Sequence, residues 1–226
     1  VETVIADFIS AAVRSQQAGF DGVELHGAHG YLICQFLSSE LNQRADQFGG
    51  SLENRARVLM SIVDGVRESC GPDFILAVRL SPERFGMRTA EIQQLFGWLV
   101  TSNKVDLIDM SLWDVFGDCA DPDFAGKKLL DQFVSLERGN VMLTVAGKIH
   151  TPADVQRVLD AGVDIVTLGR AAILHHDYPQ KMQADASFSP RTLPVTEAVL
   201  VQEGLSPAFI GYMKNWKGFV VEANAS

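Results

Sequence analysis

Short apolar runs alternate with longer segments of helical periodicity along most of the chain. The runs are rich in Val, Ile and Leu and are typical of strands buried on both faces. They predict strands at residues 22–26, 74–81, 105–112, 141–147 and 164–169. The segments with apolar positions at helical spacing predict helices at residues 3–17, 51–70, 89–101 and 126–138, and a further helix within TPADVQRVLDAG. This alternation of strands and helices predicts an α/β fold.

Several of the expected helix ends carry capping residues. Gly19 stands where a glycine would end the first helix. Ser51 fits the N-cap of the helix that runs to about residue 70. Thr151, Pro152 and Asp154 fit the N-cap, N1 and N3 positions of a helix start. These local signals support the helix boundaries that the periodicity predicts.

Polar and glycine positions recur where the expected strands end, and this favours one of two architectures. A doubly wound sheet concentrates its chemistry at one switch point, and no G-x-G-x-x-G fingerprint follows any expected strand. A (β/α)₈ barrel instead spreads its site over the carboxyl ends of many strands. We therefore expect a TIM-barrel architecture, of which five βα units can be counted. The strand-end positions are His26, Arg79, Ser81, Ser111, Ala146, Gly147, Gly169 and Arg170.

Composition and charge narrow the range of partners and compartments. The 226 residues are 47% hydrophobic and 21% charged, which is typical of a soluble globular protein, and residues 1–226 are expected to form a single domain. The net charge of −9 and the scattered Lys and Arg argue against a nucleic-acid-binding or membrane-binding surface. No apolar run approaches about 18 residues, and Val1 opens neither a charged n-region nor an apolar h-region. Cys34, Cys70 and Cys119 form no disulfide framework, so we expect the cytoplasm.

Two motifs together resemble the old yellow enzyme family of flavin-dependent oxidoreductases. AGFDGVELHGAHGYLICQFLS is followed by NQRADQFGGSLENRARVL, and then by AVRLS, VAGKI and VDIVTLGRAAI, in the order and at the separations of that family. The resemblance covers nearly the whole chain. It implies an FMN cofactor reduced by NADH or NADPH, and it implies that the five βα units are strands four to eight of the barrel, the first three units being missing from this chain.

His26, His29 and Tyr31 lie within six residues, directly after the first expected strand. Two histidines in an H-x-x-H pattern raise the alternative of zinc, but no nearby cysteine or carboxylate is placed to complete a tetrahedron, so we expect no metal. The family resemblance implies that His26 and His29 donate hydrogen bonds to the oxygen of a ligand stacked over the flavin, as an oxyanion hole does. It implies that Tyr31 protonates the acceptor, since a phenol keeps its proton at neutral pH.

Arg79 closes the strand FILAVRLS, and two partners for it can be considered. By resemblance, its guanidinium faces the flavin where reduction leaves negative charge, and an arginine can hold that charge without losing its proton. The alternative is an internal salt bridge, with Asp109 as the candidate. A charge inside a barrel must be paired in either case.

The last two expected strands supply a candidate phosphate site, as is frequent in such barrels. Gly147 and Gly169 let backbone amides approach an anion, and Arg170 can fork onto phosphate oxygens. The helix expected to begin near Ala171 points its positive end to the same place. The cofactor-binding set on these strands is Ala146, Gly147, Leu168, Gly169 and Arg170.

The sequence leaves two hypotheses of different class. The first is an enzyme in which NAD(P)H reduces FMN and the flavin passes a hydride to an electron-poor alkene or a similar small molecule. The second is an incomplete, non-catalytic barrel that does not hold FMN by itself. The C-terminal GLSPAFIGYMKNWKGFV has helical spacing and is expected to pack on the barrel, and a homo-oligomer through this segment is a further expectation from the family.

Overall fold

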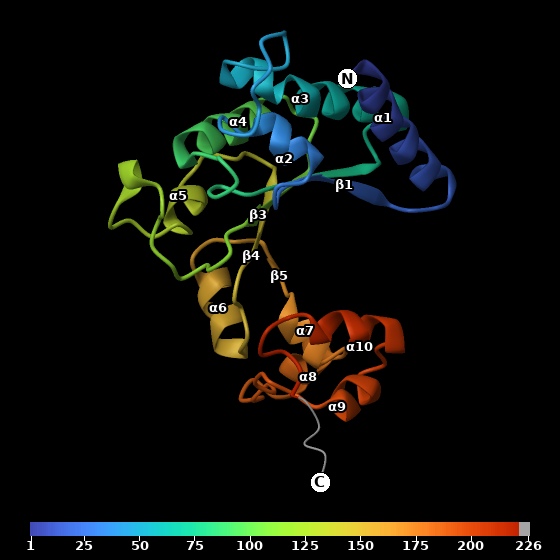
Figure 1. Cartoon of the computed structure of the whole chain (residues 1–226), viewed down its shortest axis with the longest axis vertical. Helices are drawn as coiled ribbons and strands as arrows, with labels where there is room; N and C mark the ends of the chain where they lie inside the picture. The colour runs from blue at the N-terminus through green and yellow to red at the C-terminus, as the bar shows by residue number, and fades with distance from the viewer. Residues whose placement is uncertain (222–226) are drawn as a thin grey trace.

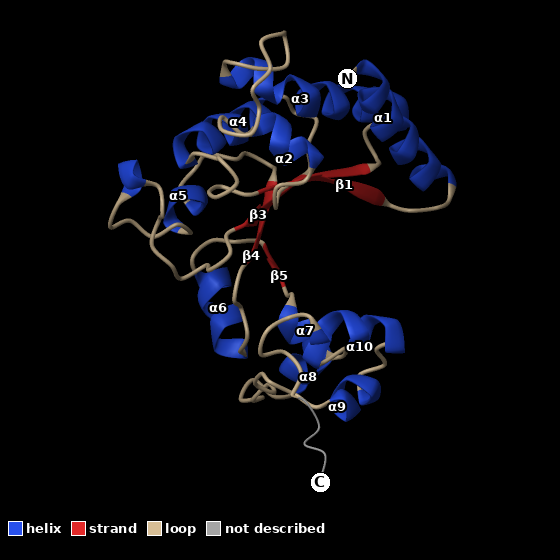
Figure 2. Ribbon diagram, viewed as in Figure 1, coloured by secondary structure: helices blue, strands red, loops and turns tan. Residues whose placement is uncertain are grey.

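The computed structural model describes residues 1–221, and these contain one sheet of five parallel strands (Figures 1 and 2). The strands lie side by side in chain order. Because every crossover leads to the next strand in the same direction, the sheet is wound as in a barrel, whereas a doubly wound sheet reverses its strand order. The strands are β1 (Gly22–Gly27), β2 (Ile75–Leu80), β3 (Leu107–Ser111), β4 (Met142–Ala146) and β5 (Ile165–Thr167).

Helices follow the strands and cover the convex side of the curved sheet (Figure 2). The capping residues act as expected: the Ser51 side chain accepts from the Asn54 amide, and Thr151 and Asp154 form a reciprocal capping box. The helices are α1 (Glu2–Gln17), α2 (Leu32–Leu37), α3 (Leu52–Cys70), α4 (Thr89–Thr101), α5 (Asp131–Val134), α6 (Pro152–Asp160), α7 (Arg170–Leu174), α8 (Tyr178–Ala184), α9 (Glu197–Gln202) and α10 (Pro207–Lys214), with a 3₁₀ turn at Pro122–Phe124.

The two faces of the sheet differ sharply in burial. Leu76 and Val78 of β2 are fully buried in the same hydrophobic core as Leu59 of α3. On the opposite face, Ile75, Met142 and Ile165 are 48%, 41% and 42% exposed, although all three are large apolar side chains. Side chains alternate between the faces of a strand, so these three lie on the inner, concave face. Within residues 1–221 the concave face is therefore open, as in a barrel that is not closed.

The prediction of a helix at residues 126–138 is wrong for most of that range. Only Asp131–Val134 is helical, and the preceding residues form a loop. Gly126 has a φ of +76°, and Lys128 forms an antiparallel bridge with Asp118. The Cys119 amide donates to the Lys127 carbonyl at 2.8 Å. Pairing across this loop uses the backbone groups that a helix would need, so the apolar spacing does not produce one.

The last expected strand is shorter than the predicted range of residues 164–169. β5 ends at Thr167, which pairs with Ala146 at the end of β4. Since β5 is the edge of the sheet in residues 1–221, it has a ladder on one side, and pairing stops where β4 stops. Leu168 and Gly169 therefore leave the sheet before α7 begins.

The C-terminal helices form a small hydrophobic core of their own, below the sheet in Figure 1. Ile210 and Met213 of α10 are buried there with Leu200 of α9 and Leu174 of α7. The C-terminal helix was expected to pack on the barrel, and its cluster joins α9 to α7, the helix that follows the last strand of the sheet. Phe209 and Tyr212 of α10 are exposed, as is Trp216, which follows this helix.

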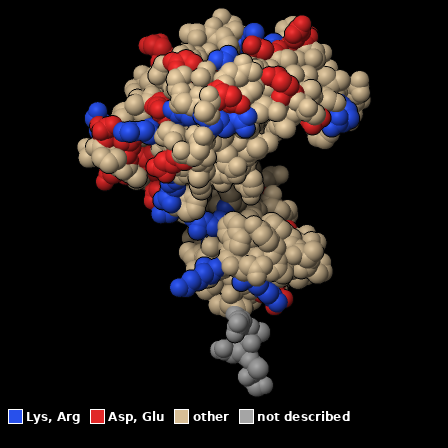
Figure 3. All heavy atoms as spheres, turned by 45° about the horizontal axis from the view of Figure 1, so that its top comes forward, with Lys and Arg blue, Asp and Glu red and all other residues tan. Residues whose placement is uncertain are grey.

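The surface and the helices of residues 1–221 have two further properties. Acidic and basic side chains are interspersed over the upper part of the face drawn in Figure 3, and the lower part is mostly uncharged. In this part of the chain, every helix is too short or too polar to cross a bilayer.

Candidate active site

The residues of the first motif come together at the carboxyl end of β1. The rings of His26 and His29 lie 5.1 Å apart between centroids, and those of His26 and Tyr31 lie 5.3 Å apart. His26 is inside β1, whereas Tyr31 is the N-cap of α2 and is 63% exposed. The phenol is therefore directed away from the core and is available to a ligand. The three residues form one cluster, as the motif predicts.

Two serines at neighbouring strand ends hold His29. The His29 amide donates to Ser81 Oγ at 3.0 Å, and His29 Nε2 lies 2.6 Å from Ser111 Oγ. A serine hydroxyl can both donate and accept, so this contact orients the imidazole ring whichever of its nitrogens carries the proton. The sequence places both serines at strand ends without assigning them a role. Their function of orienting His29 follows from the parallel register, which aligns these strand ends.

The surroundings of His26 and His29 favour the neutral form of both imidazoles. Burial lowers the pKa of His26 and of His29, and the nearby Arg79 lowers both further. For His29, the charge of His26 acts in the same direction. Neutral imidazoles can donate a hydrogen bond to a ligand oxygen without adding a second positive charge beside Arg79.

Arg79 forms the internal salt bridge that the sequence leaves as an alternative. Its Nε lies 3.1 Å from Asp109 Oδ2, although the N–H is not aligned for a hydrogen bond. Arg79 Nη2 lies 3.5 Å from Ser111 Oγ, so the guanidinium extends from Asp109 toward the strand ends. Burial raises the pKa of Asp109 to about 7, against the opposing effect of Arg79. Within residues 1–221, Arg79 Nε and Asp109 Oδ1 are buried without a hydrogen-bond partner.

A cavity of about 530 Å³ runs from His29 to the last two strands, and His26, Tyr31 and Arg79 do not line it. Its size falls in the range of small-molecule sites. Leu168 does not line it and packs against the core instead. The predicted site residues on its wall are His29, Ala146, Gly147, Gly169 and Arg170.

The structure requires glycine at position 147 of the expected phosphate site for a different reason than it favours glycine at position 169. A Cβ at Gly147 would lie 2.8 Å from the Trp113 carbonyl carbon, and Gly147 has a φ of +150°. Gly147 is therefore required by the close approach of the loop after β3. A Cβ at Gly169 would meet no protein atom within 4 Å and would extend into open space. Gly169 thus leaves room for a ligand, whereas α7, only five residues long, adds little helix dipole.

Residues with strained backbone surround this end of the sheet. Non-glycine residues in the left-handed region are uncommon, cost about 1–3 kcal/mol each and cluster at functional sites. Asn103 lies apart from the strand ends, and the others in residues 1–221 follow strands β1 to β4. These are His29, Arg84, Phe85, Trp113 and Lys148.

A family model described as the NADH:flavin oxidoreductase / NADH oxidase family matches residues 1–187. The chain belongs to this family. The match confirms the resemblance to the old yellow enzymes, and with it the cofactors of the family, FMN and NAD(P)H. The probable NADH-dependent flavin oxidoreductase YqiG of Bacillus subtilis (strain 168) is 35% identical over 193 residues, which cover 81% of this chain and 51% of the relative. The putative 12-oxophytodienoate reductase-like protein 1 of Arabidopsis thaliana is 32% identical over 192 residues, which cover 84% and 58%.

Solved structures of the old yellow enzyme family confirm the partial barrel. A morphinone reductase structure matches with a TM-score of 0.70 at 30% identity and covers 88% of this chain and 52% of that chain. Another, in complex with tetrahydroNAD, matches with a TM-score of 0.68 at 29% identity. The chain thus spans about half the length of the relatives that it matches.

The cavity also contains residues that sequence reasoning did not assign. Trp113 and His150 lie in the loops after β3 and β4, and Trp216 follows α10. For the two loop residues the available signal was their place beyond a strand end, where the old yellow enzyme family has its site. Trp216 gave no such signal, because nothing local indicates that the C-terminal segment returns to the cavity.

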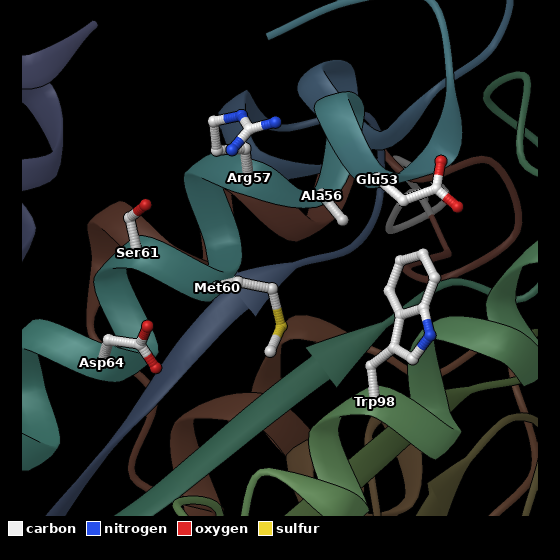
Figure 4. Close-up of a pocket in the computed structure, with 7 residues that line it drawn as sticks. All are labelled: Glu53, Ala56, Arg57, Met60, Ser61, Asp64 and Trp98. Atoms are coloured by element: carbon white, nitrogen blue, oxygen red, sulfur yellow. The ribbon is translucent and has the colours of Figure 1, made fainter. Parts of the chain in front are cut away.

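Two other features of residues 1–221 lie outside this site. A hollow of about 330 Å³ between α3 and α4 is lined by residues such as Met60 and Trp98 (Figure 4), and no strand end contributes to it. His175, Asp177 and Glu203 place potential ligand atoms within 4.8 Å of one another. However, Glu203 is hydrogen-bonded to Arg191 and His176, so its carboxylate is already in use.

Proposed function

We propose that this chain carries the acceptor-binding and phosphate-binding parts of an FMN-dependent oxidoreductase of old yellow enzyme type. In such an enzyme, NAD(P)H reduces FMN, and the flavin supplies hydride transfer to an electron-poor alkene or a related small molecule. The observation that carries the proposal is the single cavity that joins His29 at β1 to Gly169 and Arg170 after β5. A ligand in it would contact both the motif histidine and the candidate phosphate site.

His26, His29 and Tyr31 would act on the acceptor. Hydride addition to an activated alkene moves negative charge onto its carbonyl oxygen, and the two neighbouring imidazoles, whose pKa values burial lowers, would donate hydrogen bonds to that oxygen. Tyr31, exposed and next to His26, would deliver the proton that completes the reduction.

The residues present fit a flavin phosphate at one end and its ring at the other. The open space beside Gly169 is a cradle that a Cβ would fill, and no ion pair is formed by Arg170 with any of residues 1–221. Arg170 would bind phosphate oxygens and Arg79 would face the ring edge where negative charge collects. The Nη2 atom of Arg79 supports this role, since it lies 3.5 Å from Ser111 Oγ at the carboxyl end of β3.

A second candidate is a barrel half that holds FMN only with its complement. The exposure of Ile75, Met142 and Ile165 on the concave face favours it, because a closed barrel buries such side chains. A ring-shaped ligand would then lack one wall of its pocket, and small-molecule sites normally bury 70–90% of the ligand. We propose that residues 1–226 act as one domain and that, alone, they bind FMN weakly or not at all.

FMN retention after desalting tests both candidates. The chain is mixed with excess FMN, alone and with the first three βα units of a family member supplied in trans, and flavin absorbance and fluorescence are then measured. We expect retention with the complement. Arg170→Ala should weaken it by about tenfold or more, while Arg14→Ala on the outer helix α1 should not.

The outcomes separate the two candidates. Stoichiometric retention by the chain alone would contradict the incomplete-barrel candidate. Failure to retain FMN under either condition would contradict the proposed oxidoreductase function.

A further inference from the structure

Three polar side chains from adjacent strands stand in one row on the concave face. The parallel register pairs His26 of β1 with Arg79 of β2, and Arg79 with Asp109 of β3. We call His26, Arg79 and Asp109 the polar row. It lies one inward-facing level below Ser81 and Ser111, which hold His29. The polar row thus begins at His26 in the candidate active site and continues beneath its serines to Asp109.

Asp109 is the buried member of this row and is incompletely neutralised. Its side chain is 3% exposed, against 21% for Arg79. Oδ2 lies 3.1 Å from Arg79 Nε, while Oδ1 has no hydrogen-bond partner within residues 1–221. A buried carboxylate normally accepts several hydrogen bonds, so this environment does not strongly favour the charged form.

The neighbours of Asp109 explain how its charge can change. Glu24 on β1 adds negative charge that raises the pKa of Asp109, and Arg79 on β2 lowers it. On the other side, β4 contributes Thr144, which does not ionise and lies 2.9 Å from Thr167 of β5 between hydroxyl oxygens. Arg79 is therefore the single cation among the described neighbours that holds Asp109 ionised.

We propose that Asp109 is a positioning residue that orients Arg79. We further propose, as part of the same role, that the Asp109 carboxylate binds a proton when the Arg79 guanidinium pairs with an anion in the candidate active site. This inference rests on the proposed function, in which the anion is the flavin after hydride addition. Hydride from the nicotinamide brings two electrons and one proton and leaves one negative charge. Arg79 balances that charge, and one solvent proton binds the Asp109 carboxylate. The proton returns to solvent when the acceptor reoxidises the flavin.

The first test needs no flavin. Carboxyl ¹³C NMR of Asp-labelled chain follows the titration of Asp109, with the signal assigned by its absence in Asp109→Asn. Burial raises the pKa of Asp109 to about 7, so we expect titration near neutral pH. Arg79→Gln should move it higher, while Asp123→Asn, on an exposed ion pair with Arg88, should leave it unchanged. Titration near pH 4, or no response to Arg79→Gln, would overturn the proposal.

The second test measures the coupling in FMN-loaded protein, with the barrel complement present if retention requires it. For a two-electron couple, each proton taken up steepens the midpoint potential by about 30 mV per pH unit. We expect one proton below pH 7, where Asp109 is already protonated, and two above it. Asp109→Asn should show one proton throughout, and Asp123→Asn should behave as the wild type.

The outcomes of this second test are distinguishable. If FMN is retained and the wild type shows no break near pH 7, the coupling is wrong while the proposed function stands. If no FMN is retained in any form, the proposed function fails and the coupling fails with it.

Discussion

The buried carboxylate of Glu203, at the end of α9, binds His176 and Arg191, which lie between α7 and α9. Replacing Glu203 with Gln should destabilise the protein in a pH-dependent way. Its Oε2 accepts from the His176 amide at 2.9 Å and lies 2.8 Å from His176 Nδ1, and Oε1 pairs with Arg191. Arg191 Nη1 also donates to the carbonyl of Leu174, the last residue of α7. Glu203 therefore ties α7, which begins at Arg170, to α9.

The size and sign of the effect follow from the carboxyl group. Burial alone would raise the pKa of Glu203, but the hydrogen bonds from His176 and Arg191 outweigh it and lower the pKa to about 2 from 4.5. At 1.36 kcal/mol per pH unit, this corresponds to about 3 kcal/mol of stability. Because the pKa is lowered by folding, the contribution is complete above pH 4.5 and is lost as the pH falls toward 2.

Urea unfolding followed by far-UV circular dichroism at pH 7, 5 and 3 measures this contribution. Glu203→Gln should be about 3 kcal/mol less stable than the wild type at pH 7, and less than half of that difference should remain at pH 3. As a control, Glu197→Gln removes the exposed ion pair between Glu197, at the start of α9, and Lys214 of α10. It should lower the free energy of unfolding by under about 1 kcal/mol. A Glu203→Gln difference that is absent at pH 7, or constant with pH, would refute the reasoning.

Three further predictions concern the site. Folding raises the pKa of Asp109 to about 7, so the folded state binds a proton more tightly than the unfolded state does. The free energy of unfolding of the wild type should therefore fall by up to about 4 kcal/mol relative to that of Asp109→Asn as the pH rises from 4 through 7. Urea unfolding measures this, and parallel stability curves would contradict it. In FMN-loaded protein, His26→Ala combined with His29→Ala should weaken phenol binding about 100-fold while flavin stays bound. Titration through the long-wavelength charge-transfer band measures this, and unchanged affinity would count against the oxyanion role. Tyr31→Phe should slow flavin oxidation by alkenes about 100-fold and spare flavin reduction by nicotinamide, and equal losses in stopped-flow measurements of the two half-reactions would exclude an acid role.

Helix positions were largely determined by the sequence alone. The helix predicted at residues 89–101 is α4, Thr89–Thr101, and the caps at Ser51 and Thr151 form as predicted. These signals are local, because a capping side chain bonds to backbone three residues away and apolar spacing reports one helix face. Where distant backbone competes, as at Lys128 with Asp118, the same local pattern failed.

The candidate site residues were named from the sequence, but their partners were not. The motif around His26 and His29 and the strand-end position of Arg170 needed no structure. In contrast, the contact of His29 with Ser111 joins residues 82 positions apart, and Asp109 could be named only as one candidate partner of Arg79.

Tertiary structure alone decided two features. One is the strand register that brings the polar row together, and the other is the close backbone approach that requires glycine at position 147. Periodicity shows which face of a strand a side chain occupies, but not which side chain of the next strand lies beside it. That choice is made when the hydrogen-bond ladders form between strands distant in the chain. It sets Asp109 against Arg79 and brings the Trp113 backbone to within 2.8 Å of a Cβ position at Gly147, so that neither feature exists before the sheet does.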